Sequence, residues 1–270
     1  MVLETHPLNA GFAWQDRNGP FRVVTGEQAE HWNRLGYFLM KEVLALEQLA
    51  ALTDALDPLE QATVEFLREK GGRVGISRAE TLTFTIHAVI RSAVARAFTR
   101  LPIFSDLCAD LLGPDCRLYW DQAVYKKPAN PEEFPWHQDN GYNFVTPQDY
   151  LTCWVPLTPA TIDNGCPWVA PGVHRMGTLK HWTTPLGYEC LSDPEDTVAI
   201  EASPGDIVVF SSLTPHRTGP NLSDSLRKAY IVQFAQDGAE MIFPDGEGQR
   251  IPQRHPDRQY RVTRNGMPAN

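Results

Sequence analysis

The chain has 270 residues, 42% of them hydrophobic, and a formal net charge of −9. This length and apolar fraction predict one well-packed domain over residues 1–270, and an acidic chain without a basic stripe is not expected to bind nucleic acid. No apolar run reaches the roughly 18 residues of a membrane helix and the N-terminus lacks a basic and apolar leader, so we expect a cytoplasmic protein with no membrane partner.

The first half of the chain is predicted to be mainly helical. Residues 36–40 have the pattern of a short apolar strand, and apolar side chains then recur at helical spacing over residues 44–68 and 91–112. Pro58 predicts either a kink in the first of these helices or a break into two. We therefore expect a helical part at about residues 40–115.

From Arg117 onward the pattern changes to short β runs separated by Gly and Pro turns, which is typical of a sandwich or barrel. We expect a mostly β chain with flanking helices, with a β core over about residues 117–236 and a polar tail at 245–270. The candidate strands cover residues 118–125, 150–157, 167–170, 197–202, 206–210 and 227–235.

A candidate metal site begins at His137 and Asp139, at the end of a predicted strand. Strand side chains alternate with a period of two, so this His-x-Asp pair places an imidazole and a carboxylate on one face. His216 follows the strand at 206–210 and is the natural third ligand. Two histidines and one carboxylate form the facial triad of non-haem iron(II) oxygenases, which leaves coordination positions open. An isolated His-x-Asp is more often an ordinary surface or core motif.

Arg227 indicates that a cosubstrate binds beside the triad. The distal carboxylate of 2-oxoglutarate needs a buried cation, and a planar guanidinium binds a carboxylate through two hydrogen bonds and stays charged when buried. The turn-like segment 220–225 lets the flanking strands form a hairpin. Parity then places Thr218 on the face of His216, and Lys228 on the face opposite Arg227. Taken alone, Arg227 would be a surface cation at a strand end.

Seven segments, in this order along the chain, resemble the phytanoyl-CoA dioxygenase family. They are His137-Gln138-Asp139, Cys153-Trp154-Val155-Pro156-Leu157, Asn164-Gly165-Cys166-Pro167-Trp168, Pro171-Gly172-Val173-His174-Arg175, Pro204-Gly205-Asp206, His216 and Arg227. A short Gly-Tyr-Phe-Leu strand leading into a helix at residues 36–57 also fits the family. The resemblance covers roughly residues 30–236.

The resemblance implies a double-stranded β-helix core of the jelly-roll, cupin-like type. It implies that Fe(II), 2-oxoglutarate and O2 are used to hydroxylate a small organic molecule, with release of succinate and CO2, although related enzymes also desaturate or rearrange their substrates. The residues it assigns are His137, Asp139 and His216 as iron ligands, Arg227 and Thr218 as 2-oxoglutarate ligands, and Gln122 and Trp154 beside the cosubstrate.

Three other functions remain open. A radical halogenase on this scaffold would need a small residue in place of the carboxylate, and Asp139 argues against it. A zinc-dependent cupin-like protein could use two histidines and an aspartate, but it would leave Arg227 without a task. A non-catalytic protein on the same scaffold is the third alternative. The oligomeric state and the substrate are not encoded in any motif.

Substrate specificity is expected in the segment 71–87, which reads as a loop leading into a strand and carries Arg73 and Arg78. Phe84 and Ile86 in this segment fit a pocket wall and a core plug equally well. A facing wall is expected from residues 140–149 through two aromatic side chains, Tyr142 and Phe144.

Other polar and sulfur-bearing residues are predicted to be structural. His174 fits a turn residue, and a solvated loop is the preferred interpretation of Lys126 and Lys127. The five cysteines are an odd number without CxxC spacing, so we expect buried free thiols, with neither a disulfide framework nor a zinc site. They are Cys108, Cys116, Cys153, Cys166 and Cys190.

Overall fold

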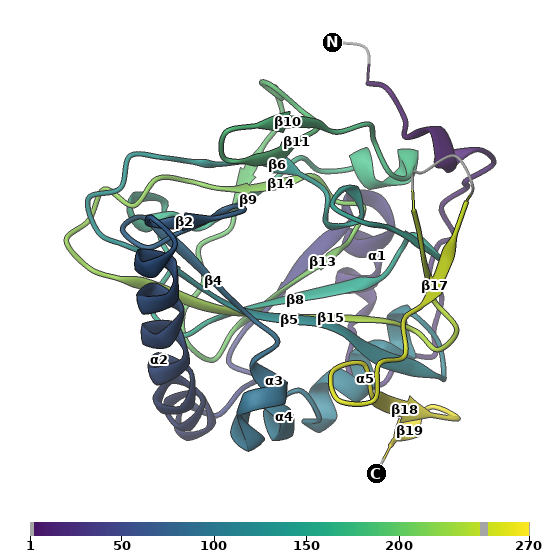
Figure 1. Cartoon of the computed structure of the whole chain (residues 1–270). Coiled ribbons are helices and arrows are strands. Elements are labelled where there is room, and N and C mark those ends of the chain that lie inside the picture. The colour runs from purple at the N-terminus through teal and green to yellow at the C-terminus, as the bar shows by residue number, and fades with distance from the viewer. Residues whose placement is uncertain (1–2, 244–247, 270) are drawn as a thin grey trace.

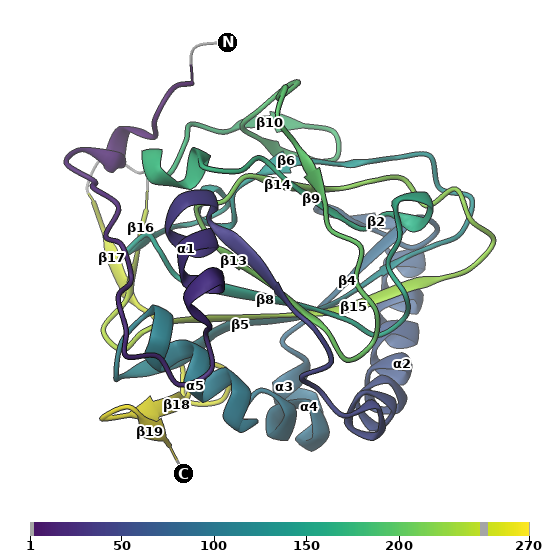
Figure 2. The same cartoon turned by 180° about the vertical axis from the view of Figure 1, so that it is seen from behind.

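The computed structural model describes residues 3–243 and 248–269. Two antiparallel sheets face each other, which gives the double-stranded β-helix predicted from the sequence (Figures 1 and 2). The larger sheet contains, in spatial order, β1 (Tyr37–Met40), β13 (Ile207–Ser211), β8 (Leu151–Pro156), β15 (Arg227–Gln236), β5 (Cys116–Lys126), β4 (Leu82–Ile86), β3 (Ser77–Arg78) and β2 (Arg73–Val74).

The smaller sheet contains, in spatial order, β12 (Val198–Ala199), β9 (Pro167–Val169), β14 (His216–Thr218) and β6 (Phe134–His137). Further pairings join β10 (Trp182–Thr184) to β11 (Gly187–Glu189), and β16 (Glu240–Ile242) to both β7 (Phe144–Thr146) and β17 (Arg250–Pro252). The nearly continuous apolar runs of β13, β8 and β15 are buried on both faces of the larger sheet, because one face packs against the helices and the other against the smaller sheet.

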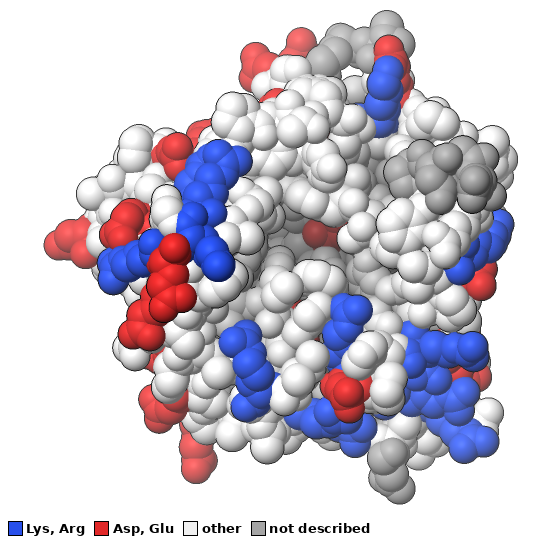
Figure 3. Space-filling view, viewed as in Figure 1, with Lys and Arg blue, Asp and Glu red and all other residues white. Residues whose placement is uncertain are grey.

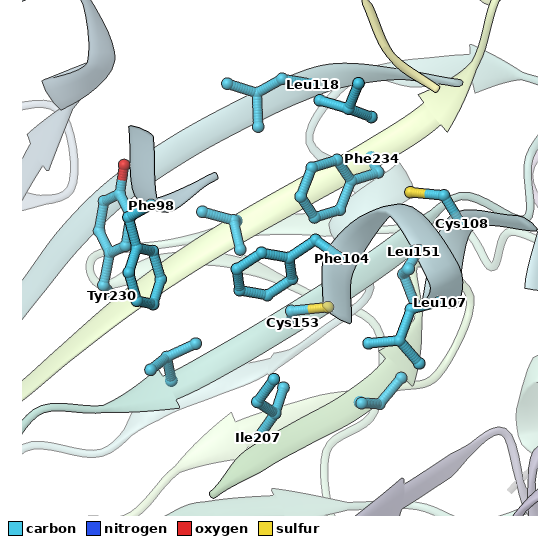
Figure 4. Packing of buried hydrophobic residues seen from close by; sticks show 14 of the residues in the cluster. Phe98, Phe104, Leu107, Cys108, Leu118, Leu151, Cys153, Ile207, Tyr230 and Phe234 are labelled. Atoms are coloured by element: carbon cyan, nitrogen blue, oxygen red, sulfur yellow. The ribbon is translucent and has the colours of Figure 1, made fainter. Parts of the chain in front are cut away.

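Helices cover the outer face of the larger sheet, opposite the smaller sheet (Figure 1). They are α1 (Gly26–Leu35), α2 (Leu46–Glu69), α3 (Ala88–Arg91), α4 (Ala93–Phe98) and α5 (Pro102–Leu111), and the short 3-10 turns are η1 (Pro7–Asn9), η2 (Asp139–Gly141), η3 (Ile162–Asn164) and η4 (Val173–Met176). Phe98 and Phe104 pack against Tyr230 and Phe234 of β15 (Figure 4). This core fixes the sheet on which the site is built.

Helix α2 is continuous through Pro58, so of the two alternatives left open by the sequence the break into two helices does not occur. The helix is also tied to the sheet by polar contacts. Tyr125 donates a hydrogen bond to Asp57 at 2.6 Å, and Thr83 donates one to Glu60 at 2.9 Å. The part of the chain predicted to be helical also contains β2, β3 and β4, because the segment after Gly71-Gly72 folds into hairpins that extend the larger sheet.

The predicted polar tail is partly built into the fold. β18 (Arg261–Arg264) pairs with β5 and with β19 (Met267–Pro268), and Tyr260 and Val262 are buried in the core between the sheet and the helices. The sequence missed this because two apolar residues among arginines give too weak a pattern. Residues 245–247 and 270 of the tail lie outside the described residues.

The other strand predictions differ from the structure mainly at their ends. Within the predicted strand 197–202 only Val198–Ala199 is a strand. The cysteines are free and buried, as predicted. Among the helices of the described residues, none has both the length and the apolar character to cross a membrane.

Candidate metal centre and adjoining cavities

His137, Asp139 and His216 come together between the two sheets. His137 is the last residue of β6 and pairs with His216, the first residue of β14, while Asp139 begins the turn η2. One ligand atom from each of the three residues lies within 4.8 Å of the others. The His-x-Asp pair and the distant histidine predicted from the sequence are therefore adjacent in space, because neighbouring strands of the smaller sheet carry them.

Both imidazoles are oriented by backbone carbonyls. The Nδ1 atom of His137 lies 2.9 Å from the carbonyl oxygen of Pro135, and that of His216 lies 3.0 Å from the carbonyl oxygen of Thr214. A ring nitrogen next to a carbonyl oxygen must donate, so each Nδ1 carries the proton and each Nε2 keeps a free lone pair. The Nε2 atom of His216 lies 3.8 Å from Oδ1 of Asp139. This is the arrangement in which a metal ion could bridge them.

Burial keeps both histidines neutral. Desolvation lowers the pKa of His137 to about 3, with the neighbouring His216 as the next cause, and it lowers the pKa of His216 to about 4. Neutral imidazole is the form that binds metals. Burial raises the pKa of Asp139, whereas His137 and a hydrogen bond from Thr152 act in the opposite direction.

The Asp139 carboxylate is held by a pair of residues that the sequence analysis did not identify. Its Oδ2 accepts a hydrogen bond from the Thr152 hydroxyl at 2.6 Å, and the Gln233 amide donates to that hydroxyl at 3.3 Å. These contacts leave Oδ1 free to face His216. Thr152 lies on β8 with the parity of Trp154, which the family resemblance placed beside the cosubstrate, so strand alternation from Trp154 could have pointed to Thr152.

A second missed residue supports the loop between the ligands. The backbone N–H of Gln138 donates a hydrogen bond to Nε2 of His181 at 3.0 Å. The His181 ring also lies directly against Gly141, where any side chain would collide with it. His181 therefore fixes the path of the chain between His137 and Asp139. Nothing in the sequence signals this role, because residue 181 lies outside the segments that resemble the family.

The three candidate ligands and Arg227 line the same inner cavity, which has a volume of 60 Å³. Arg227 is 1% exposed, and none of its three guanidinium nitrogen atoms has a hydrogen-bond partner among the described residues. The Trp154 ring lies 5.5 Å from the guanidinium carbon. Burial lowers the pKa of Arg227 to about 10, so the side chain remains a cation at neutral pH. An unpaired buried cation at the end of a cavity is suited to an anion.

The predicted parity of β15 agrees with the structure. Arg227 and Ile231 face the inner cavity, whereas Lys228 lies on the other face and its Nζ binds Asp57 at 2.7 Å. The remaining predicted cosubstrate residues also line this cavity, which brings every predicted metal and cosubstrate ligand to one place. These residues are Thr218 on β14, Gln122 on β5 and Trp154 on β8.

Two expectations about lysines and aromatics near the site were wrong. Lys126 is not on a solvated loop, because it is fully buried at the end of β5 and its Nζ binds the carbonyl oxygen of Gly219. Lys127 forms an ion pair with Glu60, with 2.6 Å between Nζ and Oε1. Phe144 does not line the site and instead stacks on a histidine near the N-terminus, with ring centroids 4.9 Å apart. The parity of β7 turns it away from the cavity.

An outer cavity of 780 Å³ opens from the candidate metal ligands to the surface. Figure 3 shows a hollow at the centre of this face with a mostly uncharged wall. Tyr142 lines the cavity as predicted, together with residues from α2. Phe84 and Ile86, which fitted a pocket wall and a core plug equally well, line it too. Arg73 and Arg78 do not line it. Both donate hydrogen bonds to the carbonyl oxygen of Pro185, at 2.9 and 2.6 Å, and thereby hold the β2–β3 hairpin against the loop between β10 and β11.

His174 lies away from both cavities, as expected of a structural residue. It is fully buried, and its ring packs edge-on against Trp14 with 4.4 Å between the ring centroids. Its ring also lies against Gly36, where a Cβ would collide with it. Gly36 has a φ of 86°, which favours glycine, so this close approach and the backbone turn both require that residue.

Comparisons with known proteins agree with this site. The family model for phytanoyl-CoA dioxygenase matches residues 32–229. A methylphosphonate hydroxylase from Gimesia maris is 25% identical over 78% of this chain and 81% of its own length. A phytanoyl-CoA dioxygenase from Arabidopsis thaliana is 27% identical, and the match spans 53% of each chain, about half the length of that relative.

Solved structures show the same fold. The non-haem α-ketoglutarate-dependent carbocyclase SnoK from nogalamycin biosynthesis superposes with a TM-score of 0.69 at 21% identity, covering 91% of this chain and all of that one. EvdO2 from Micromonospora carbonacea, solved with 2-oxoglutarate, gives a TM-score of 0.64 at 23% identity over 86% of this chain and 97% of its own. The chain thus belongs to the phytanoyl-CoA dioxygenase family and is an iron(II)- and 2-oxoglutarate-dependent dioxygenase.

Proposed function

We propose that this dioxygenase hydroxylates a small organic molecule, with His137, Asp139 and His216 as the Fe(II) ligands and Arg227 as the anchor for 2-oxoglutarate. The donor set fits the metal, because two neutral imidazoles with free Nε2 atoms and one carboxylate converge within 4.8 Å. Iron, once bound with 2-oxoglutarate and O2, supplies the oxidising chemistry. The chain's own residues hold, orient and enclose the reactants.

The observation that carries this proposal is the unpartnered guanidinium of Arg227. Leaving a charge buried without a partner costs several kcal/mol, so folded chains rarely keep one without a function. The inner cavity connects this charge to the candidate metal ligands. A dicarboxylate that chelates a metal at one end would place its other carboxylate at the guanidinium, which binds it through two hydrogen bonds.

The other residues of the inner cavity would orient the cosubstrate. The Thr218 hydroxyl could donate a hydrogen bond to the same carboxylate, because Thr218 shares the cavity with Arg227. Trp154 closes the cavity wall beside the guanidinium. The Gln122 side chain is held by the Trp120 indole, whose Nε1 donates to Oε1 of Gln122 at 3.1 Å. Gln122 lines both cavities and so would lie between cosubstrate and substrate.

Hydroxylation of a small molecule is supported by the relatives. One is named a methylphosphonate hydroxylase and another, from an uncultured bacterium, a 2-aminoethylphosphonate dioxygenase. A cytoplasmic location belongs to the proposal and is supported by five free cysteines, since oxidising compartments favour disulfides. We also propose that residues 1–270 form one domain.

The proposal is tested by the release of succinate from 2-oxoglutarate, which requires O2 and Fe(II) but no knowledge of the substrate, because such enzymes turn over slowly without it. His137→Ala, Asp139→Ala and His216→Ala should each abolish succinate release. His255→Ala changes a histidine outside both cavities and serves as the control. Wild-type rates in the His216→Ala protein would overturn the assignment.

A further inference from the structure

The wall of the outer cavity is mainly apolar. Most of its lining side chains are apolar or aromatic, and they come from α2, from the β2–β3 hairpin and from the strands around the candidate metal ligands. They include Phe66, Ile76, Phe84, Tyr119, Trp120, Phe134, Tyr142 and Tyr150. With a volume of 780 Å³, the cavity is in the range of pockets that enclose drug-sized ligands.

Apolar side chains continue from the wall to the molecular surface. Phe66, Val74 and Ile86 line the cavity and are 48%, 45% and 45% exposed. Exposed apolar side chains that cluster around an opening mark a surface that a ligand or partner covers. These exposed side chains continue the cavity wall. A molecule bound in the cavity would therefore also cover them, and it would extend from the candidate metal ligands to the surface.

The charged groups of the outer cavity are Asp139 and Arg91, considering the described residues. Asp139 is committed to the candidate metal site, which leaves Arg91 as the cation available to a substrate. Its Nη2 donates to the carbonyl oxygen of Ile86 at 3.0 Å, and no carboxylate of the described residues forms an ion pair with it. Arg91 lines the outer cavity but not the inner one.

We infer that the substrate is a drug-sized organic molecule, mainly apolar and aromatic, that carries one anionic group, which binds Arg91. This inference rests on the proposed function and names the substrate class of the same site. A small phosphonate, as in the names of two relatives, has little apolar surface to bury here and carries up to two charges. Among the described residues that line the outer cavity, Arg91 is the one side-chain cation available to such a headgroup.

Two fluorescent probes of nearly the same shape test this inference. Anilinonaphthalene sulfonate has an aromatic body and one anionic group, and N-phenylnaphthylamine has the aromatic body alone. Both should bind the protein, with fluorescence that rises to a single saturating value. Arg91→Gln should weaken the sulfonate about fivefold, the most expected of an exposed charge pair, and should leave the neutral probe unchanged. Arg68→Gln, which changes an exposed arginine of α2 outside the cavity, should change neither.

Two tryptophan substitutions on α2 test whether the probes bind in the outer cavity. Ala62 and Gln61 are adjacent exposed residues of α2, but only Ala62 lines the outer cavity. Ala62→Trp should weaken both probes tenfold or more, whereas Gln61→Trp should leave both unchanged. Methylphosphonate should displace neither probe. The inference is overturned if the two tryptophan variants behave alike, if Arg91→Gln affects both probes equally, or if methylphosphonate displaces the probes at a lower concentration than they need to bind.

The probe titrations need no iron, so they are separable from a test of the proposed function. In parallel, the protein is loaded anaerobically with Fe(II) and 2-oxoglutarate, and its visible charge-transfer absorption is recorded. Absence of this absorption together with the expected probe pattern would overturn the proposed function and leave the size and polarity of the cavity's ligand as inferred. Presence of this absorption without the expected probe pattern would overturn the substrate class alone.

Discussion

Replacing Arg227 by leucine removes the guanidinium that would bind 2-oxoglutarate, at nearly constant apolar bulk. The loss of a buried partner for a charged group costs about 2–5 kcal/mol. Taking about 3 kcal/mol at about 1.4 kcal/mol per tenfold, the Kd for 2-oxoglutarate should rise by roughly two orders of magnitude. Arg227→Lys should recover only part of this, because an ammonium group cannot reproduce the two parallel hydrogen bonds.

The assay is anaerobic isothermal titration calorimetry of 2-oxoglutarate into the Fe(II)-loaded protein. Lys228→Met is the matched control: Lys228 is the next residue of β15, but it faces α2 and pairs with Asp57. It should leave the Kd unchanged. Arg227→Leu should not destabilise the protein in the absence of 2-oxoglutarate, because it removes a buried cation that has no hydrogen-bond partner among the described residues. A large effect of Lys228→Met with none of Arg227→Leu would refute the reasoning.

The remaining predictions concern the metal ligands. Thr152→Val removes the hydrogen bond to the Asp139 carboxylate and should weaken Fe(II) binding by about 10- to 100-fold in equilibrium dialysis, with little change in Tm; unchanged affinity would exclude this supporting role. Because burial lowers the pKa of His137 to about 3 and that of His216 to about 4, the metal-free protein should keep its full stability above about pH 6.5 and lose it as the pH falls through 4 and 3. The slope near pH 5, measured by urea unfolding, should be up to about 1.4 kcal/mol per pH unit for each of the two histidines, and His216→Gln should reduce it by one histidine's share; an equal slope in the variant would contradict neutral burial of that ring. Because Asp139 occupies the position that a halide would need, high chloride should leave the product unchanged, and mass spectrometry of a chlorinated product would contradict this.

The sequence predicted the parts of the site that depend on strand parity. Arg227 has the parity of Ile231, so the face that these two residues share follows from the period of a strand. His137 ends β6 and Asp139 lies in the turn η2, so these two ligands meet although strand parity does not extend to Asp139. His216 was predicted as the third ligand because it follows a predicted strand, whereas its pairing with His137 depends on the order of strands in the smaller sheet, which was not predicted.

The errors arose where the neighbours of a side chain lie far away in sequence. Lys126 resembles a solvated lysine next to Lys127, but the loop at Gly219 covers it and accepts its hydrogen bond. Arg73 and Arg78 follow a glycine pair and look free to meet a substrate. The carbonyl oxygen of Pro185, more than a hundred residues away, accepts hydrogen bonds from both. Burial and partner choice of this kind are properties of the packed structure.

The central claim is that the triad and Arg227 together hold iron and 2-oxoglutarate. It is tested most directly by titrating 2-oxoglutarate into the anaerobic protein loaded with Fe(II) and following the visible charge-transfer absorption of the chelate. We predict that the absorption saturates at one equivalent of each, disappears in His216→Ala, and needs far more 2-oxoglutarate in Arg227→Leu. Absence of the absorption in the wild type, or an unchanged titration in the His216→Ala protein, would contradict the account.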